Sequence, residues 1–352
     1  MSFAGRPDIS EAFERQAKAC ADMGAPFTSN LCRVLDKRLD ETSAFGRRVA
    51  AWPSDSLWPD LVPLRCTAAL NNLVRTGRAP TLAAFYPPHT PGDDDAFWGA
   101  ISATIAEHDA EMTAFLNSPP QTNEVVRSAV LLGGFLTIAA ATSKPLALYE
   151  LGASAGLNLL FDRYAYDLDD GRKWGDAKSP VRIGSPWSGA APALDTKLEI
   201  VSRAAVDLKP VDARSREDRE RMLAYIWPEQ TERLRRIEPA LDMVAASALV
   251  VQAGDALQWL KTVAAGPPPE GVCRVIFHSV FFQYLPADLR DALRKEITAL
   301  GERATTRAPL AWLSMESGAD RMSCELRLTL WPGGERRKLA DVDWHGRWAK
   351  WV

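Results

Sequence analysis

The spacing of the apolar residues changes near residue 144, and few folds are compatible with that change. From Ile9 to about Ala141 these residues recur every three or four positions, which is typical of amphipathic helices. After Lys144 and Pro145, short apolar runs alternate with helical segments instead. The alternation predicts an open α/β sheet with helices on both faces. We therefore expect an all-helical domain over residues 1–143 and an α/β domain over residues 144–352.

The expected elements follow from this division. Amphipathic helices are predicted at 11–23, 27–39, 61–77 and 96–117, with a further helix starting within 118–135. Strands are predicted at 146–151, 198–208, the first part of 248–260, 273–285 and 308–317, with a closing antiparallel pair within 324–352. Helices are expected between these strands at 216–227, 229–246 and 287–304.

Composition and charge narrow the class of protein. The 352 residues are 47% hydrophobic and 25% charged, with a formal net charge of -3, as in ordinary globular proteins. No block of basic residues occurs, so nucleic acid is not an expected partner. The apolar run 128–141 is too short to cross a bilayer, and residues 1–20 lack the apolar core of a secretory signal. We expect a cytoplasmic protein without a membrane partner.

The five cysteines and four histidines are scattered along the chain. They form neither a Cys-x-x-Cys pair nor a His-Glu-x-x-His motif. We therefore expect reduced, mostly buried thiols and no metal site.

The segment 148–158, LYELGASAGLN, places a glycine-rich loop directly after the first expected strand. As Gly-x-Ser-x-Gly, its centre has the form of the nucleophile elbow of a serine hydrolase. Preceded by Glu150, it also has the form of a loop that wraps a nucleotide-like cofactor at a helix N-terminus. A hydrolase sheet needs several strands ahead of Ser154, whereas everything ahead of it is predicted to be helical. The cofactor interpretation is therefore preferred, with these candidate residues: Glu150, Gly152, Ala153, Ser154, Gly156 and Asn158.

Polar residues also stand at the ends of later strands. Asp207, Asp255 and the pair His278 and Ser279 each follow an apolar run. One such residue is ordinarily a turn former. Ligands of open α/β sheets bind at the carboxyl ends of the strands, near the point where the strand order reverses. Acidic or polar ends on successive strands therefore predict a binding site there.

The helix that starts within 118–135 carries Asn123, Glu124 and Arg127 in its first turn. Asn123 and Arg127 lie one turn apart and share a face. Two interpretations stay open. The polar residues either cap the helix beside a surface arginine, or they grip a ligand near residues 152–156. The second makes Arg127 a cofactor residue and Asn123 and Glu124 substrate residues.

Residues 144–352 resemble the class I S-adenosylmethionine-dependent methyltransferases. ALYELGASAGLN matches their first motif, with Ser154 in place of a glycine, and AVDLKP, AGDAL and VIFHSVFFQYL are similar to their second, third and fourth strand ends. The resemblance implies a Rossmann-like sheet that is mostly parallel with an antiparallel final strand. The stretch from Asn158 to Asp207 is longer than in that family, with an insertion at about 165–195.

The same resemblance implies a methyltransferase that uses S-adenosylmethionine as cofactor and a small molecule as acceptor. Asp207 would hold the ribose, and Asp255 with Ala256 would face the adenine. His278 and Ser279 would border the methyl group, with His278 as a general base, because histidine is the side chain whose reference pKa lies near neutrality. The alternative for His278 is a strand-end histidine bonded to a backbone carbonyl. The helical domain would roof the site and select the acceptor.

The whole chain also resembles a bacterial family of unknown function, through QTNEVVRSA, ELGASAGLNLLFDRYAY, AYIWPEQ, FHSVFFQYL and LWPGG. We expect most of the tyrosines and tryptophans around the cleft to pack between the helical part and the sheet. A few of them, such as Tyr284, are candidates for an acceptor pocket, and Glu316 is a further candidate. Two alternatives remain. One is a serine hydrolase built on Ser154, with Asp255 and His278 or His345. The other is a non-catalytic ligand-binding or interaction protein.

Overall fold

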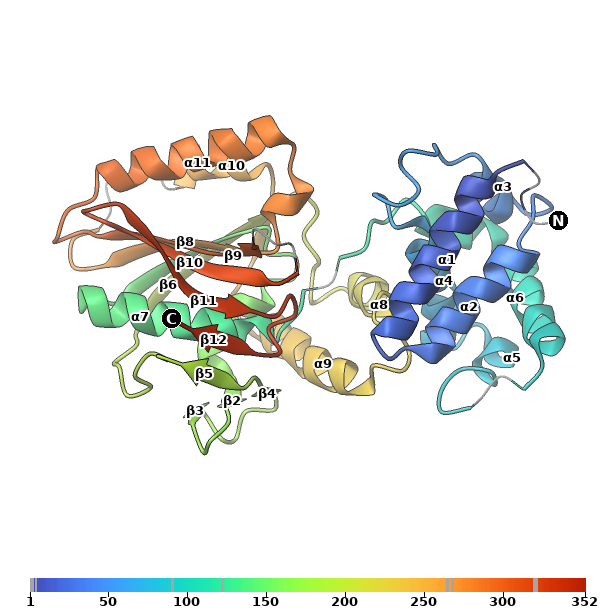
Figure 1. Ribbon diagram of the computed structural model, residues 1–352, viewed down its shortest axis with the longest axis horizontal. Helices are drawn as coiled ribbons and strands as arrows, with labels where there is room; N and C mark the ends of the chain where they lie inside the picture. Colours follow the sequence, from blue (N-terminus) through green and yellow to red (C-terminus); the bar gives the residue numbers. More distant parts are fainter. Residues whose placement is uncertain are drawn as a thin grey trace. The chain divides into compact units, whose positions relative to one another are not determined.

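The computed structural model describes residues 3, 5–89, 92–121, 123–263, 266, 269–318 and 322–352. The chain forms two compact units (Figure 1). Unit 1 comprises residues 1–122 and 215–235, and unit 2 comprises residues 123–214 and 236–352. The predicted mixed α/β class is confirmed, because unit 2 contains a large sheet covered by helices.

Unit 1 is built from helices that share one apolar core. The longer ones are α1 (Pro7–Asp22), α2 (Pro26–Arg38), α4 (Val62–Arg75) and α6 (Asp94–Phe115), which confirms the four predicted segments. The shorter ones are α3 (Ala44–Ala50), α5 (Pro80–Ala83) and α8 (Arg216–Ala224). Asn71 of α4 donates to the carbonyls of Ala224 and Ile226 at 2.9 and 3.0 Å, which ties the end of α8 to this core.

The main sheet of unit 2 has the strand order β5-β12-β11-β10-β9-β8-β1-β6-β7 among the described residues. Its first members along the chain are β1 (Leu146–Leu151), β5 (Trp187–Gly189), β6 (Ile200–Asp207) and β7 (Val251–Ala253). The later members are β8 (Cys273–Ser279), β9 (Leu310–Ser317), β10 (Cys324–Trp331), β11 (Glu335–Val342) and β12 (Ala349–Trp351). The strands β7, β6, β1, β8 and β9 are parallel to one another, as predicted.

The closing antiparallel pair predicted within 324–352 is present as β10 and β11, but β12 is added to it, so the antiparallel part is larger than the single final strand that the resemblance implied. β10, β11 and β12 each run antiparallel to the preceding strand. β5 then joins the edge by pairing in parallel with β12. The meander therefore extends the parallel sheet rather than closing it with one strand.

The segment after the glycine loop also differs from its prediction. The loop leads into the 3-10 helix η1 (Leu157–Arg163), not into an α-helix. The expected insertion forms a small separate sheet of β2 (Ala165–Asp167), β3 (Lys173–Gly175) and β4 (Arg182–Gly184) before the chain reaches β5.

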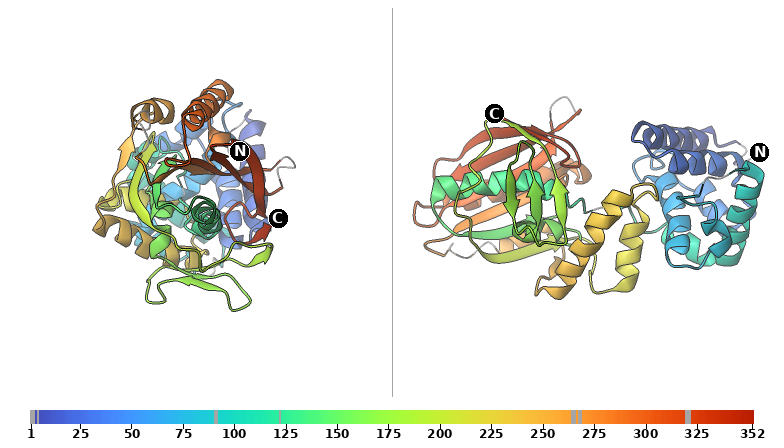
Figure 2. Two further views of the ribbon diagram at one scale, coloured as in Figure 1. Left: turned by 90° about the vertical axis from the view of Figure 1, so that its left-hand side faces the viewer. Right: turned by 90° about the horizontal axis from the view of Figure 1, so that it is seen from below.

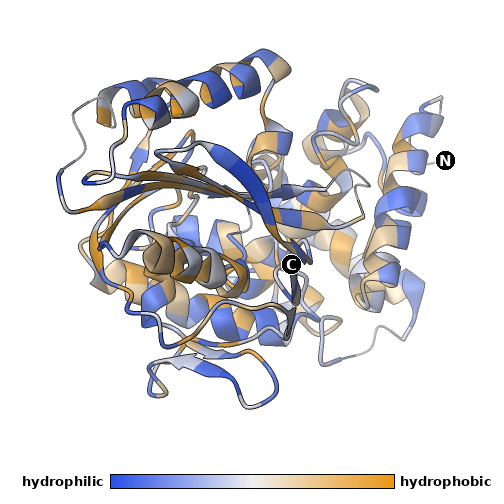
Figure 3. Ribbon diagram, turned by 60° about the vertical axis from the view of Figure 1, so that its left-hand side comes forward, coloured by the Kyte–Doolittle hydropathy of each residue, from blue (hydrophilic) through white to orange (hydrophobic). Residues whose placement is uncertain are grey.

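Helices cover both faces of the main sheet (Figure 2). α10 (Ala256–Val263) and α11 (Ala287–Glu302) share an apolar core with one face, and α7 (Arg127–Thr142) packs against the other. α9 (Thr231–Ala246) runs from unit 1 into unit 2. The central strands and α7 are largely apolar, as Figure 3 shows. Within the described ranges, no helix combines the length and apolarity that crossing a bilayer requires.

The helix α7, which the sequence analysis placed in the helical domain, belongs to unit 2 because it docks closely on the sheet. A Cβ atom on Gly133 would lie 2.1 Å from the ring of Trp351, and one on Gly134 would lie 2.6 Å from Leu313. These glycines therefore set the distance between α7 and the strands. The thiols follow their prediction, since all five cysteines are free and buried.

We predict opposite effects for the same substitution at two helical glycines. Gly133→Ala should lower the free energy of unfolding by about 1–3 kcal/mol, because the new methyl group overlaps a buried indole. Gly99→Ala in α6 meets open space and should raise it by up to about 1 kcal/mol through helix propensity. Denaturant unfolding of both variants measures the difference. Equal effects at the two positions would contradict the docking of α7.

Candidate functional site

The strand order of the sheet reverses at β1. From β1 the chain adds β6 and β7 on one side and β8 and β9 on the other. Ligands of open α/β sheets bind at the carboxyl ends of the strands beside such a reversal. The loop of residues 152–156 lies at the carboxyl end of β1, so this edge is the candidate functional site.

The glycine loop alternates in backbone conformation. Gly152, Ser154 and Gly156 have φ values of +68°, +53° and +76°. The N–H groups of Gly152 and Ala153 both donate to the carbonyl of Val206, at 2.9 and 3.1 Å. The loop therefore folds across the end of β6. Ser154 adopts a left-handed conformation that glycine takes more easily, which explains why a glycine suits this position.

Asp207, at the end of β6, holds the loop through its carboxylate. Its Oδ2 accepts the N–H of Ser154 at 2.8 Å, and its Oδ1 accepts the N–H of Lys209 at 2.9 Å. The structure thus brings Asp207 next to the loop, as predicted, and gives it a structural task there. Asp255 follows the adjoining strand β7, and the N–H of Gly254 donates to the carbonyl of Asp207 at 3.0 Å. The two acids therefore stand at neighbouring strand ends.

The side chains of Glu150 and Asn158 are buried beside this loop, with exposures of 1% and 0%. Among the described residues, no hydrogen bond reaches Glu150 Oε2, Ser154 Oγ or either amide atom of Asn158. Buried polar atoms without partners are rare in folded proteins, since each costs free energy. This cluster is therefore a place where a polar ligand group can bind.

Glu150 is electrostatically unusual. Burial raises its pKa well above the ordinary value, and the nearby Asp207 carboxylate adds to the rise. The side chain of Asn158, which lies near the carboxyl group without forming a well-aligned hydrogen bond to it, and the charge of Arg127 both lower this pKa. A cationic or hydrogen-bond-donating ligand would offset the burial of this carboxyl group.

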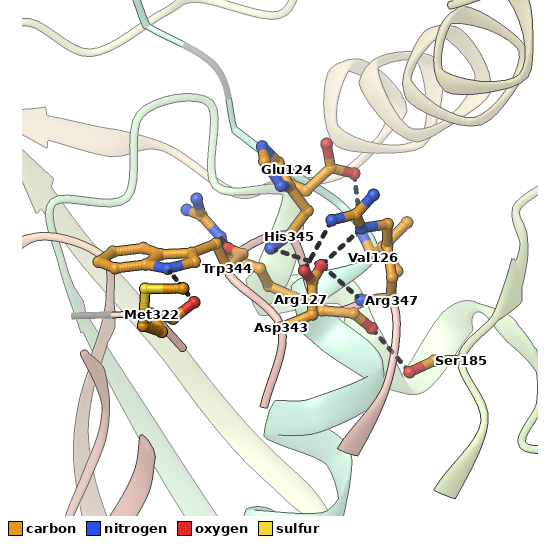
Figure 4. Close-up of polar contacts among 10 residues, drawn as sticks. Glu124, Val126, Arg127, Ser185, Met322, Asp343, Trp344, His345 and Arg347 are labelled. Carbon is orange, nitrogen blue, oxygen red and sulfur yellow. Dashed lines mark hydrogen bonds and ion pairs between the residues drawn. The ribbon is translucent and has the colours of Figure 1, made fainter. Parts of the chain in front are cut away.

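α7 begins at Arg127, so Asn123 and Glu124 precede the helix instead of forming its predicted first turn, and all three residues contact the protein. Asn123 Oδ1 accepts the N–H of Leu157 at 2.8 Å and so begins η1. Glu124 Oε1 accepts the N–H of Val126 at 3.2 Å. Arg127 Nε donates to the carbonyl of Trp344 at 2.9 Å (Figure 4). All three residues therefore have structural contacts, but none of them is a side-chain cap of α7, and their roles toward a ligand stay predictions.

The turn between β11 and β12 packs against this end of α7 (Figure 4). In this turn, the carboxylate of Asp343 accepts hydrogen bonds from Nε and Nη2 of Arg347, both at 2.8 Å. Burial alone would raise the pKa of Asp343, but the hydrogen bonds from Arg347 and from nearby backbone N–H groups lower it. Ser185 Oγ donates to the carbonyl of Gly346 at 2.7 Å, which joins the turn to the segment before β5. These contacts stabilise the turn between β11 and β12, next to Arg127.

His278 is not available as a general base, which corrects the expectation from the sequence. Its side chain has no exposed surface. Trp312 Nε1 donates to its Nε2 at 3.0 Å, and its Nδ1 lies 2.6 Å from Glu316 Oε1. An indole nitrogen only donates, so Nε2 must accept and Nδ1 carries the proton that Glu316 accepts. Both ring nitrogens are therefore occupied by the protein.

Glu316, at the end of β9, is the carboxylate that His278 orients. Its Oε1 also accepts the N–H groups of Phe281 and Phe282 at 2.9 and 3.2 Å. Val280, with a φ of +52°, turns the chain so that these two donors converge. Among the described residues Oε2 makes no hydrogen bond, and the side chain is 20% exposed. A single acid ending the apolar run 308–315 was the only sequence signal for this residue.

The remaining predicted residues have simpler surroundings. Asp255 Oδ1 accepts the N–H of Gln258 at 2.9 Å and caps α10, in which Ala256 is the first residue. Ser279 ends β8. Tyr284 is 72% exposed on the 3-10 helix η2 (Phe282–Tyr284).

Two observations limit the motif-based interpretations. A Cβ on Gly152 would lie 2.3 Å from the ring of Phe281, so that ring covers the face of the glycine. The hydrolase triad is not assembled, because Ser154 Oγ has no hydrogen bond within the described residues and both nitrogens of His278 bind elsewhere. His345 belongs to the turn between β11 and β12, away from these contacts in the chain.

We predict that Glu150→Gln stabilises the protein at neutral and higher pH. A carboxyl group with a raised folded-state pKa stays protonated in the fold while the unfolded chain ionises, so its contribution to stability falls as pH rises above about 4.5. The variant should gain at least about 1 kcal/mol at pH 8 and nothing near pH 4.5. Denaturant unfolding across this range measures the gain. The exposed Glu199→Gln should show no such pH dependence.

A second prediction concerns the left-handed loop. Ser154→Gly should raise the free energy of unfolding by about 1 kcal/mol, because glycine adopts a φ of +53° without a Cβ clash. Ser154→Ala keeps the Cβ atom and should not produce this gain. Thermal unfolding of the pair checks the loop geometry, and a stabilising alanine with a neutral glycine would contradict it.

Comparison with known proteins identifies the family of the chain. The model of a family described as "Uncharacterized protein conserved in bacteria (DUF2332)" matches residues 10–351. No curated protein and no solved structure gives a significant match. Since the family match spans nearly the whole chain, this protein belongs to the bacterial DUF2332 family.

Proposed function

We propose that this protein is an S-adenosylmethionine-dependent methyltransferase that acts on a small molecule, with the cofactor at the carboxyl edge of β1, β6 and β7. The observation that carries the proposal is the cluster of buried polar atoms without partners on Glu150, Ser154 and Asn158. These atoms lie in and around a glycine-rich loop at the reversal of the strand order.

The strand order supports a nucleotide-type cofactor. Counted along the chain, the parallel strands β1, β6, β7, β8 and β9 lie in the spatial order third, second, first, fourth, fifth. Doubly wound sheets that bind dinucleotides begin with this order and hold the ligand above the first strand. The loop leads into the short 3-10 helix η1, so no α-helix dipole contributes to binding at this site.

The residues present fit the chemical groups of the cofactor. The loop at Ser154–Gly156 and the amide of Asn158 would hold the methionine part, and Glu150 can accept from its ammonium group. Asp207 would bind the ribose, since each carboxylate oxygen can accept more than one hydrogen bond. Asp255 would face the adenine. Phe281 covers Gly152, so the cofactor could approach the backbone closely only at the later part of the loop.

S-adenosylmethionine supplies a methyl group on a sulfonium that is its own leaving group, so the protein mainly aligns the acceptor and excludes water. Acceptors that lose a proton need a base. Glu316 fits this role better than His278, because its Oε1 is fixed by three donors while Oε2 makes no hydrogen bond within the described residues. His278 would then be a positioning residue.

Calorimetry with S-adenosylmethionine and S-adenosylhomocysteine tests the proposal. The wild type should bind both, and Asn158→Leu should lose at least about tenfold in affinity, equivalent to one hydrogen-bonded contact. Since leucine removes an unpartnered buried amide, the variant should also unfold at an equal or higher temperature. Asn117→Leu, at an exposed position, is the matched control. No heat at millimolar ligand would refute cofactor binding.

The same assay separates binding from transfer. Glu316→Gln retains an oxygen for the N–H donors and should bind S-adenosylmethionine as the wild type does. Transfer of labelled methyl to a bacterial small-molecule extract should fall at least about 100-fold. Unchanged transfer would remove Glu316 as the base and leave the cofactor site standing. Labelling of Ser154 by a serine-directed probe would instead favour a hydrolase.

A further inference from the structure

A pocket lies on the face of the main sheet that α10 and α11 cover, between α11 and strands β9 to β11. We call it the α11 pocket and define it by Arg294, Thr298, Trp312, Thr329, Trp331 and Arg336. Its volume of about 620 Å³ is within the range of small-ligand sites. Trp331 pairs with Leu310, the first residue of β9, whereas Glu316 lies near the last. The pocket is therefore at the opposite end of β9 from the candidate cofactor site.

Trp331 is the fixed wall of the α11 pocket. A Cβ on Gly301 would lie 2.3 Å from its indole ring, and one on Gly334 would lie 2.8 Å from its Nε1. The indole is thus held between two glycines, one on α11 and one in the turn after β10. This packing accounts for the sequence LWPGG, which the candidate site at the other end of the strands does not use.

The pocket presents donors that the protein leaves unused. Within the described residues, neither Trp331 Nε1 nor Thr329 Oγ1 has a hydrogen-bond partner in the protein, and both side chains line the pocket with only 7% and 5% of their residues exposed. Each is able to donate to an acceptor oxygen. The floor therefore favours a ligand rich in acceptors.

The charges around the pocket are mainly positive. Arg336 makes no hydrogen bond or ion pair with any described residue, and its guanidinium carbon lies 5.5 Å from the centre of the Trp312 ring. Burial lowers the pKa of Arg336, and the charges of Arg327 and Arg294 lower it further, with Glu325 opposing them. Arg327 is paired with Glu325, and Arg294 with Asp291. Arg336 is thus a crowded cation that a bound anion would neutralise.

We propose that the α11 pocket binds a small oxyanion, a phosphate or a carboxylate, through Arg336, Arg294 and the donors of Thr329 and Trp331. Guanidinium groups match the hydrogen-bonding geometry of both anions. Glu302 is the one acid among the described lining residues, so the net charge of the lining is positive. The proposal does not rest on the methyltransferase assignment, because no lining residue belongs to the cofactor set.

Calorimetry with inorganic phosphate and with acetate on the full chain tests this site and separates the two anions. Arg336→Gln should weaken binding of the preferred anion at least about tenfold. Arg337→Gln is the matched control, since adjacent residues of β11 point to opposite faces and Arg337 does not line the pocket. Glu302→Gln should leave binding unchanged or tighter. All three variants should bind S-adenosylmethionine as the wild type does.

Equal loss in the Arg336 and Arg337 variants would mean nonspecific attraction to a basic surface and would overturn the proposal. No binding of either anion by the wild type would do the same. Thermal unfolding provides a second readout. Arg336→Gln should not be less stable without anion, because it removes one of three mutually repelling cations. Phosphate should raise the unfolding temperature of the wild type but not of this variant.

Discussion

The docking of α7 on the main sheet is the contact on which the candidate site depends. Gly133 and Gly134 allow the helix backbone to approach Trp351 and Leu313, and this depth determines where the first turn of α7 lies. Asn123, which precedes α7, accepts a hydrogen bond from the start of η1, and Arg127 donates a hydrogen bond to the turn after β11. One helix thus fixes two segments that are distant in sequence. Because η1 carries Asn158, the geometry around Glu150 follows from the same contact.

The carboxyl edge of the sheet combines two features that oppose stability. The first is the burial of polar atoms without hydrogen-bond partners on Glu150 and Asn158, which costs free energy. Leu148 and Leu151, on either side of Glu150 in β1, bury apolar side chains and carry no such cost. Ser154 and Val280 both adopt left-handed conformations that their side chains disfavour. Chains that break several local rules within one small region generally do so at functional sites. The coincidence of orphaned polar atoms and strained turns therefore supports a ligand at this edge.

Much of the fold followed from local sequence patterns, whereas the site depended on contacts between distant residues. Periodicity predicted the four longer helices of unit 1 but not the short α3 and α5, and it predicted the strands β1, β6, β7, β8 and β9. The sequence also showed Glu150 directly before the loop. No local pattern could show that Trp312 donates to His278, since the pairing of β8 with β9 creates that contact. The same holds for Phe281 over Gly152 and for Asn123 at the start of η1. Capping and ligand binding use the same residue types, so only the tertiary structure separates them.

Trp312 connects the two proposed sites. Its ring lines the α11 pocket beneath Arg336, and its N–H donates to His278, which in turn donates to Glu316. Hydrogen bonds in such a chain polarise one another, most strongly where solvent is excluded. Neutralising Arg336 would change the field at the indole and hence the donor strength toward the histidine. The buried imidazole of His278 therefore holds the Glu316 carboxylate in a fixed position at the end of β9. Its inaccessibility, which removes it as a base, is what makes that positioning rigid.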